Sequence, residues 1–228
     1  MSRLPTIVMS AIIALAPAAA MAETPRELLT TAAFQTQSKS AALALVDQAI
    51  KASEKILSTR PGDHEAILQQ GVAIGYRAKL TRNRGDAKAS LAIFQRLAAK
   101  DPRDAEAQLA LAGWHLDAID QLGGFLAQTV LGAKAQAGEA ALGRAVALGG
   151  DRAFYPGVAA MMLIRKNRDN VAQARLWAEL AMKAQTPTPL DALMKRAATA
   201  IAPALRANDG KAAAGIARKL LPFGKLAE

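Results

Sequence analysis

The chain of 228 residues lacks cysteine entirely and contains only two histidines. The absence of cysteine excludes disulfide frameworks, thiolate catalysis and cysteine-based zinc sites, and an exported domain of this length does not need disulfides. His64 and His115 are 51 positions apart, and neither belongs to a zinc motif such as H-E-x-x-H. We therefore expect no metal site.

Catalytic and nucleotide-binding motifs are also missing. The chain has no G-x-S-x-G elbow and no P-loop. The glycine pairs Gly123-Gly124 and Gly149-Gly150 do not follow a predicted strand, so they do not indicate dinucleotide binding. Aromatic residues make up only 4% of the chain, and none interleaves with a basic run as nucleic-acid binding would require. We expect no cofactor, no nucleic-acid partner and no catalytic residues.

No apolar run after Glu23 is long enough to suggest a membrane segment. At the N-terminus, Arg3 precedes an apolar run at 7–16, and Ala20-Met21-Ala22 forms a small-x-small cleavage site. This pattern predicts a cleavable signal peptide at 1–22 and export to the periplasm. Without cysteine there is no lipid attachment, so we expect a soluble protein. The alternative is an uncleaved N-terminal anchor.

A helix, stop and helix pattern is the main feature that is present. The clearest copy runs from Gly85 to Leu116, where Asp101-Pro102 ends the first helix because proline disfavours helical backbone in the preceding residue. Asp104 can cap the second helix, and Gly85 with Asp86 suits the turn and N-cap of the first. The pattern predicts two helices joined by a short turn.

The same pattern recurs along the chain. Further turns and helix ends are predicted at Arg60–Asp63, Leu148–Gly150, Thr186-Pro187, Asp209-Gly210 and Pro222. Amphipathic hairpins of this kind bury their apolar faces only by stacking on one another, and the abundant alanine lets helices approach closely. The sequence therefore predicts an all-α fold of antiparallel helical hairpins.

Individual residues extend this pattern to a known family. The segment from Ala49 to Gly150 resembles tetratricopeptide repeats, which are helical hairpins of about 34 residues. Ser90, Phe94, Leu97 and Pro102 fall at its small, aromatic, small and proline positions, Ala112 and His115 at its glycine and tyrosine positions, and Gly71 at the glycine of the preceding unit. Leu97 is larger than the family prefers, and the 41-residue spacing of Pro61 and Pro102 implies an insertion.

The resemblance implies a TPR-like α-solenoid at 40–222, with a lead-in at 23–39 and a C-terminal tail at 223–228. It implies a non-catalytic scaffold that binds a protein, a peptide or a small ligand on its concave face. A second resemblance, carried by Gly113-Trp114-His115, Gly123-Gly124-Phe125 and Leu131-Gly132, is to TRAP-transporter accessory (TatT) proteins and regulators of microtubule dynamics. It implies an accessory role in periplasmic solute transport, with 122–133 helping to form a ligand pore.

The segment 114–125 holds the candidate ligand-binding or partner-binding residues. Asp117 and Asp120 share a helix face near a C-terminus that disfavours negative charge, which indicates either a site for a cationic group or pairing with a lysine or arginine of the next hairpin. Trp114 and His115 either pack in the core or contact a ligand, and Phe125 either lines an apolar cleft or packs within a short helix at 122–133. A further hypothesis is an enzyme with His115, Asp117 and Asp120 as a proton-transfer cluster.

The formal net charge of +10 favours anionic partners. Positive residues cluster in two predicted turns, around 77–88 and 165–168. The functional interpretation is docking to anionic lipid headgroups, an acidic protein or an anionic ligand; the alternative is solvated turn charges that partly cap helices. The candidate docking patch comprises Arg82, Arg84, Arg165, Lys166 and Arg168.

Overall fold

The computed structural model describes residues 23–226, so the predicted signal peptide lies outside the described residues. Helices dominate, no strand occurs between residues 23 and 226, and one isolated parallel bridge joins Arg152 to Gln185. The all-α prediction is confirmed. The helices are α1 (Pro25–Phe34), α2 (Lys39–Thr59), α3 (His64–Thr81), α4 (Arg84–Lys100), α5 (Ala105–Leu122), α6 (Gly124–Leu131), α7 (Ala135–Leu148), α8 (Phe154–Lys166), α9 (Val171–Lys183), α10 (Pro189–Arg206) and α11 (Gly210–Leu220).

Local turn chemistry sets most helix ends where the sequence predicts them. Asp101-Pro102 separates α4 from α5, and the Asp104 carboxylate caps α5 by accepting from the amides of Glu106 and Ala107. The predicted cap of α4 is wrong by a few residues: Asn83, and not Asp86, caps this helix, because its side-chain oxygen accepts from the Asp86 amide.

The segment expected to be a lead-in contains a packed helix. Thr24 and Glu27 form a capping box at the start of α1, which then buries Leu28 and Leu29 against α2 and α3. Amphipathic spacing explains the burial, because apolar residues recur on one helix face. The packed domain therefore begins with α1.

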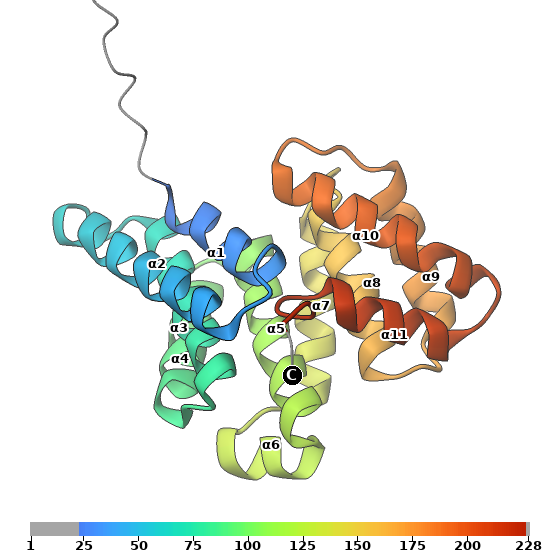
Figure 1. The fold of residues 1–228 in the computed structure, drawn as a ribbon, viewed down its shortest axis with the longest axis horizontal. Helices are drawn as coiled ribbons and strands as arrows, with labels where there is room; N and C mark the ends of the chain where they lie inside the picture. The colour runs from blue at the N-terminus through green and yellow to red at the C-terminus, as the bar shows by residue number, and fades with distance from the viewer. Residues whose placement is uncertain (1–22, 227–228) are drawn as a thin grey trace, which may run out of the picture.

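Most consecutive helices pack side by side, and they wind from α1 at one side, through α5 and α7 in the centre, to α8–α11 at the other (Figure 1). Other contacts skip one or more helices: α5 packs on α7, α10 packs on α8, and α11 packs on α8 as well as on α10. In a regular solenoid each repeat contacts only its neighbours. The C-terminal helices thus form a bundle, and the resemblance to tetratricopeptide repeats stays a prediction.

Small residues allow α3 and α4 to approach closely. A Cβ atom added at Gly71 would lie 2.8 Å from both Ile93 Cγ2 and Phe94 Cε1, so only glycine fits there. Across the same contact, the buried Ser90 hydroxyl donates a 2.9 Å hydrogen bond to the Gly71 carbonyl oxygen. The small residues that the sequence pattern singled out at 71 and 90 therefore meet each other in the hairpin.

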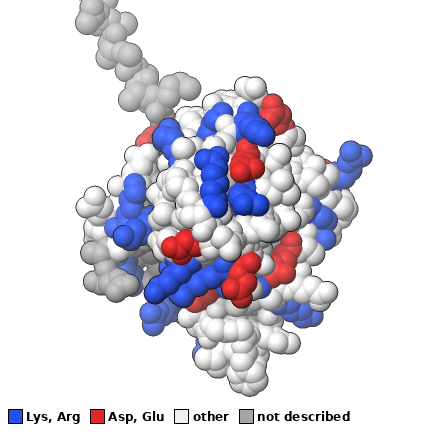
Figure 2. Space-filling model, turned by 90° about the vertical axis from the view of Figure 1, so that its right-hand side faces the viewer, with Lys and Arg blue, Asp and Glu red and all other residues white. Residues whose placement is uncertain are grey.

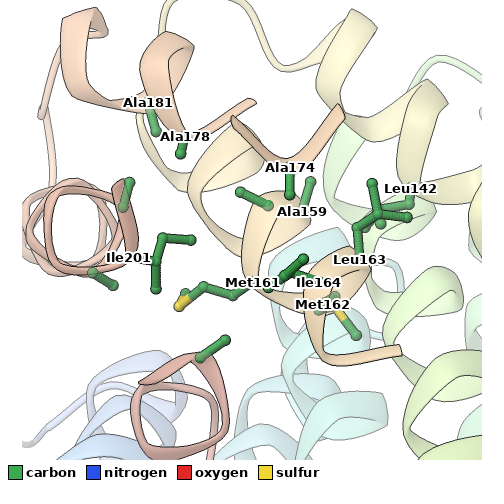
Figure 3. Packing of buried hydrophobic residues seen from close by; sticks show 14 of the residues in the cluster. Leu142, Ala159, Met161, Met162, Leu163, Ile164, Ala174, Ala178, Ala181 and Ile201 are labelled. Carbon is green, nitrogen blue, oxygen red and sulfur yellow. The ribbon is translucent and has the colours of Figure 1, made fainter. Parts of the chain in front are cut away.

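The largest core cluster is built by α5 and α7–α11. Figure 3 shows Met161 of α8 reaching toward Ile201 of α10, and both side chains are fully buried. Alanines on α9, including Ala174 and Ala178, let that helix approach closely. Two smaller clusters lie between α1, α2 and α3 and between α3, α4 and α5.

The segment after α11 returns to the N-terminal helices. Phe223 and Leu226 pack on the α1–α3 cluster, and the Phe223 amide donates a 2.8 Å hydrogen bond to the Ala33 carbonyl oxygen. The segment predicted to be a tail therefore begins with a contact that joins the two ends of the helical succession (Figure 1).

Candidate functional site

A cavity of about 590 Å³ lies between the N-terminal and C-terminal helices. Its lining residues come from α1, α3, α4, α5, α6, α8 and α10 and from the segment after α11. The volume falls within the roughly 300–1,000 Å³ of small-molecule sites. Most lining side chains are apolar, among them Leu29, Phe34, Leu68, Val72, Trp114, Val158, Met162 and Met194.

An arginine network stands at one part of the lining. Arg26 of α1 donates hydrogen bonds of 2.7 and 2.6 Å to the two carboxylate oxygens of Glu65, and it also contacts Glu106 of α5. Burial lowers the pKa of Arg26, but the hydrogen bonds and charges of the two carboxylates outweigh it and raise that pKa further above its usual range. Both cavity-lining charges in this network, Arg26 and Glu106, are thus paired.

Asp117 of α5 joins three helices. Its carboxylate accepts a 3.0 Å hydrogen bond from Lys79 Nζ of α3 and also contacts the Arg165 guanidinium of α8. Burial raises the pKa of Asp117, but the two cations outweigh it and hold the pKa well below its usual range. The carboxylate is therefore charged at neutral pH and serves as an internal ion-pair partner.

The turn between α3 and α4 brings two further charges to the cavity. Arg82 and Arg84 both line it, both are exposed, and neither has an ion-pair partner among residues 23–226. Trp114 fixes the adjacent wall, because its indole Nε1 donates a 2.8 Å hydrogen bond to the carbonyl oxygen of Ala87 in the first turns of α4. An apolar wall next to two unpaired cations can bind a ligand that is apolar at one end and anionic at the other.

The structure separates the other candidate residues of the 114–125 segment. His115 is buried, and its Nδ1 accepts a 3.2 Å hydrogen bond from the Lys134 amide; burial first, and then the charge of Lys134, lower its pKa. Asp120 lies 3.7 Å from Arg165 Nε and 3.7 Å from Arg218 Nη2. Phe125 is 80% exposed and does not line the cavity, whereas Leu122 and Leu126 on either side of it do.

The two predicted basic turns differ in their surroundings. Arg165 is buried, and its guanidinium contacts the carboxylate of Asp117 on α5. It therefore does not belong to a surface patch. Lys166 contacts Glu139 of α7. Arg168 is exposed in the turn after α8, away from the cavity lining. Of the expected docking residues, only Arg82 and Arg84 reach the cavity.

His115, Asp117 and Asp120 do not converge on one point. Within the described part of the chain, no hydrogen bond joins the imidazole to either carboxylate, since each group has other partners. Of the three residues only Asp117 lines the cavity. A proton-transfer cluster requires such mutual contacts, so the geometry does not support this hypothesis.

Several cavity residues were not singled out by the sequence. Leu29 and Phe34 belong to α1, and the Thr24–Glu27 capping box was the available indication of that helix. Met162 lines the cavity although its side chain is only 4% exposed. Phe154 and Met194 carry no local pattern that marks a site.

No protein-family model, curated protein or solved structure matched this chain. Among residues 23–226, no helix combines the length and the apolar character that crossing a bilayer requires. The fold and the cavity define the class: an all-helical chain with a partly open, mostly apolar space of ligand size.

Proposed function

We propose that this chain is a non-catalytic, exported binding protein with a TPR-like helical scaffold, and that its cavity holds a small ligand with an apolar body and an anionic end. One observation carries the proposal. The cavity lining is mostly apolar, and its charged residues pair with acids or bases of the fold except for Arg82 and Arg84. Export rests on the N-terminal sequence pattern.

The size and the concave lining of the cavity favour a small ligand over a protein partner. Its volume of about 590 Å³ matches a single small molecule, and its walls come from seven helices. Burial of an apolar ligand body would supply most of the affinity, at roughly 25 cal/mol per Å² removed from water. The arginines would then orient the anionic end at the α3–α4 turn.

Fluorescence titration tests this proposal with two probes, a fluorescent long-chain carboxylate and its uncharged methyl ester. We expect saturable binding of both probes and tighter binding of the carboxylate. Ala118 lines the cavity, so the larger side chain of Ala118→Phe should occupy part of the space that the ligand needs. Binding should weaken about tenfold or more, because packed sites are sensitive to small changes in volume. Ala140→Phe is the matched control, because Ala140 is exposed on α7 and outside the lining. Binding that Ala118→Phe leaves unchanged would contradict the cavity as the site.

A second candidate function is an accessory protein of a periplasmic solute transporter of the TRAP type. The observation that favours it is that α6 and its flanks contribute Leu122, Leu126, Val130 and Leu131 to the cavity, as a pore-forming segment would. Calorimetric titration with the solute-binding protein of such a transporter tests it. A complex whose affinity depends on bound solute supports this function, and the absence of any complex contradicts it.

A further inference from the structure

Helix α6 exposes an unusual amount of apolar surface. Five large hydrophobic residues are exposed in the described chain, and three of them, Leu122 at 41%, Phe125 at 80% and Leu126 at 52%, lie within five positions of one another. Scattered exposed apolar residues are ordinary, but a contiguous group indicates a contact surface. Only Ala127 of α6 is fully buried, and Val130 and Leu131 are half-buried, so packing leaves Phe125 and Leu126 exposed.

The surroundings of α6 separate it from the rest of the protein. No charged residue occurs between Asp120 and Lys134. Gly123 and Gly132 bound the helix, each with a φ of 76°, so the chain turns sharply away from α5 and back toward α7. Helix α6 lies at the lower end of the molecule in Figure 1, and Figure 2 shows that end as a mostly white protrusion with both basic and acidic side chains above it.

Positive charge borders this protrusion. Lys134 follows α6 directly and is exposed, while Arg82 and Arg84 share the cavity lining with Leu126. None of the three cations forms an ion pair within residues 23–226. The nearby carboxylates are already engaged, Asp86 by Arg77 at 2.7 Å and Asp120 by Arg165 at 3.7 Å. Arg82, Arg84 and Lys134 therefore add positive charge beside α6 that no ion pair within residues 23–226 offsets.

We propose that α6, with Arg82, Arg84 and Lys134 around it, is a docking surface for an anionic lipid bilayer. Apolar side chains of an interfacial helix insert about 5–10 Å into the headgroup and acyl boundary, and bordering cations attract anionic lipids. Eight residues of helix are about 12 Å long, which is far too short to span a bilayer but sufficient for such insertion. A stable protein interface covers roughly 800 Å² on each partner, more than two helical turns offer.

Docking through α6 would also place the cavity against the membrane. Leu126 and Val130 face the cavity while Phe125 points outside it, so an amphipathic ligand would pass between the bilayer and the cavity beside α6. This last step rests on the proposed function, whereas bilayer docking itself does not.

Vesicle co-sedimentation tests the docking surface. The chain from residue 23 onward, which contains every described helix, avoids any contribution from the apolar run at 7–16. It is mixed with vesicles of phosphatidylcholine alone or of an equimolar mixture with phosphatidylglycerol. We expect binding to the anionic vesicles, weaker binding at high salt because exposed charges are screened, and little binding to phosphatidylcholine.

The variants locate the surface. Phe125→Glu should reduce partitioning into anionic vesicles about tenfold or more, because it replaces the most exposed apolar side chain by a charge repelled from them. Leu176→Glu is the control, because Leu176 is an exposed apolar residue of α9, far from α6 in the sequence, with the same 52% exposure as Leu126. Its partitioning into anionic vesicles should stay within about twofold of the parent. Lys134→Glu should weaken binding to anionic vesicles, and Arg196→Glu, at an exposed position of α10, should not.

Ligand binding measured without vesicles keeps the two proposals apart. Phe125 lies outside the cavity, so Phe125→Glu should leave probe binding unchanged while it removes vesicle binding. Failure of the parent chain to bind anionic vesicles, equal binding by Phe125→Glu, or an equal loss in Leu176→Glu would each overturn the docking surface. A chain that docks on vesicles but binds no probe would contradict the cavity ligand alone.

Discussion

The Phe223 ring packs edge-on against Tyr76, with ring centroids 4.8 Å apart and an interplanar angle of 78°. Tyr76 belongs to α3 and Phe223 to the segment after α11, so this contact joins the first and last parts of the described chain. Lys79 Nζ lies 5.9 Å from the Phe223 ring centroid and 3.4 Å from the Pro222 carbonyl oxygen, to which it donates. Since Tyr76, Lys79 and Pro222 line the cavity, the contact also forms part of its wall.

Replacing Phe223 should therefore affect both stability and ligand binding. Phe223→Ala removes a half-buried ring and an aromatic pair, which should lower the free energy of unfolding by about 1–3 kcal/mol. It should also weaken probe binding, because the wall beside Tyr76 loses its support. Urea denaturation and probe titration measure the two effects. The exposed neighbour Lys225 provides the control, and Lys225→Ala should change neither.

Gly71 is the position where the helix packing is least tolerant. A methyl group there would meet Ile93 Cγ2 and Phe94 Cε1 at 2.8 Å, so Gly71→Ala should destabilise the protein by about 1–3 kcal/mol through overpacking. Gly143 offers the opposite case, because nothing lies within 4 Å of an added Cβ in the middle of α7. Gly143→Ala should stabilise by about 0.5–1 kcal/mol through helix propensity. Thermal unfolding of the two variants should shift in opposite directions, and a shared direction would contradict the α3–α4 packing.

The helices were predictable because their ends depend on local chemistry. Asp104 caps α5 from within its own turn, and Pro102 stops α4 without help from distant residues. The cavity was not predictable in the same way, because its walls combine Phe34, Trp114 and Met194, which only the tertiary fold brings together. Tertiary packing also decides which charges reach solvent, and no local pattern carries that information.

Arg165 illustrates this limit. Its place at the end of α8 next to Lys166 suggested an exposed basic turn, yet its partner Asp117 lies 48 positions away in α5. The sequence left two interpretations of Asp117 open, a site for a cationic group or an architectural pairing. The contacts to Lys79 and Arg165 show the pairing. Among the charges that line the cavity, Arg82 and Arg84 are then the ones without an ion-pair partner within residues 23–226.

Removing the Asp117 charge should be costly. Asp117→Asn leaves the buried Arg165 without its closest counter-charge, so the free energy of unfolding at pH 7 should fall by about 3 kcal/mol. Asp120→Asn is the control on the same helix, because its 3.7 Å contacts are longer and more exposed, and it should cost less than about 1 kcal/mol. Urea denaturation compares them, and equal losses would contradict the special role of Asp117.

The Asp117→Asn variant should also differ from the parent chain in acid. Because the pKa of Asp117 is lower in the folded state than the ordinary value of about 4, its stabilising contribution is present above that value and is lost as the pH falls toward the folded pKa. The parent chain should therefore lose stability between neutral pH and acid more steeply than Asp117→Asn.

Arg84 allows a test of the cavity charge that does not weaken the fold. It occupies the first turn of α4, where the partial positive charge of the helix end disfavours a cation and favours an acid, so Arg84→Glu should leave thermal stability equal or slightly higher. The same change reverses a charge beside the cavity, and it should weaken the carboxylate probe about tenfold or more while it changes the methyl ester less than about twofold. Arg96→Glu, at an exposed position further along the same helix and outside the cavity lining, should leave both affinities unchanged. Equal weakening of both probes would show that Arg84 shapes the cavity wall and does not recognise charge.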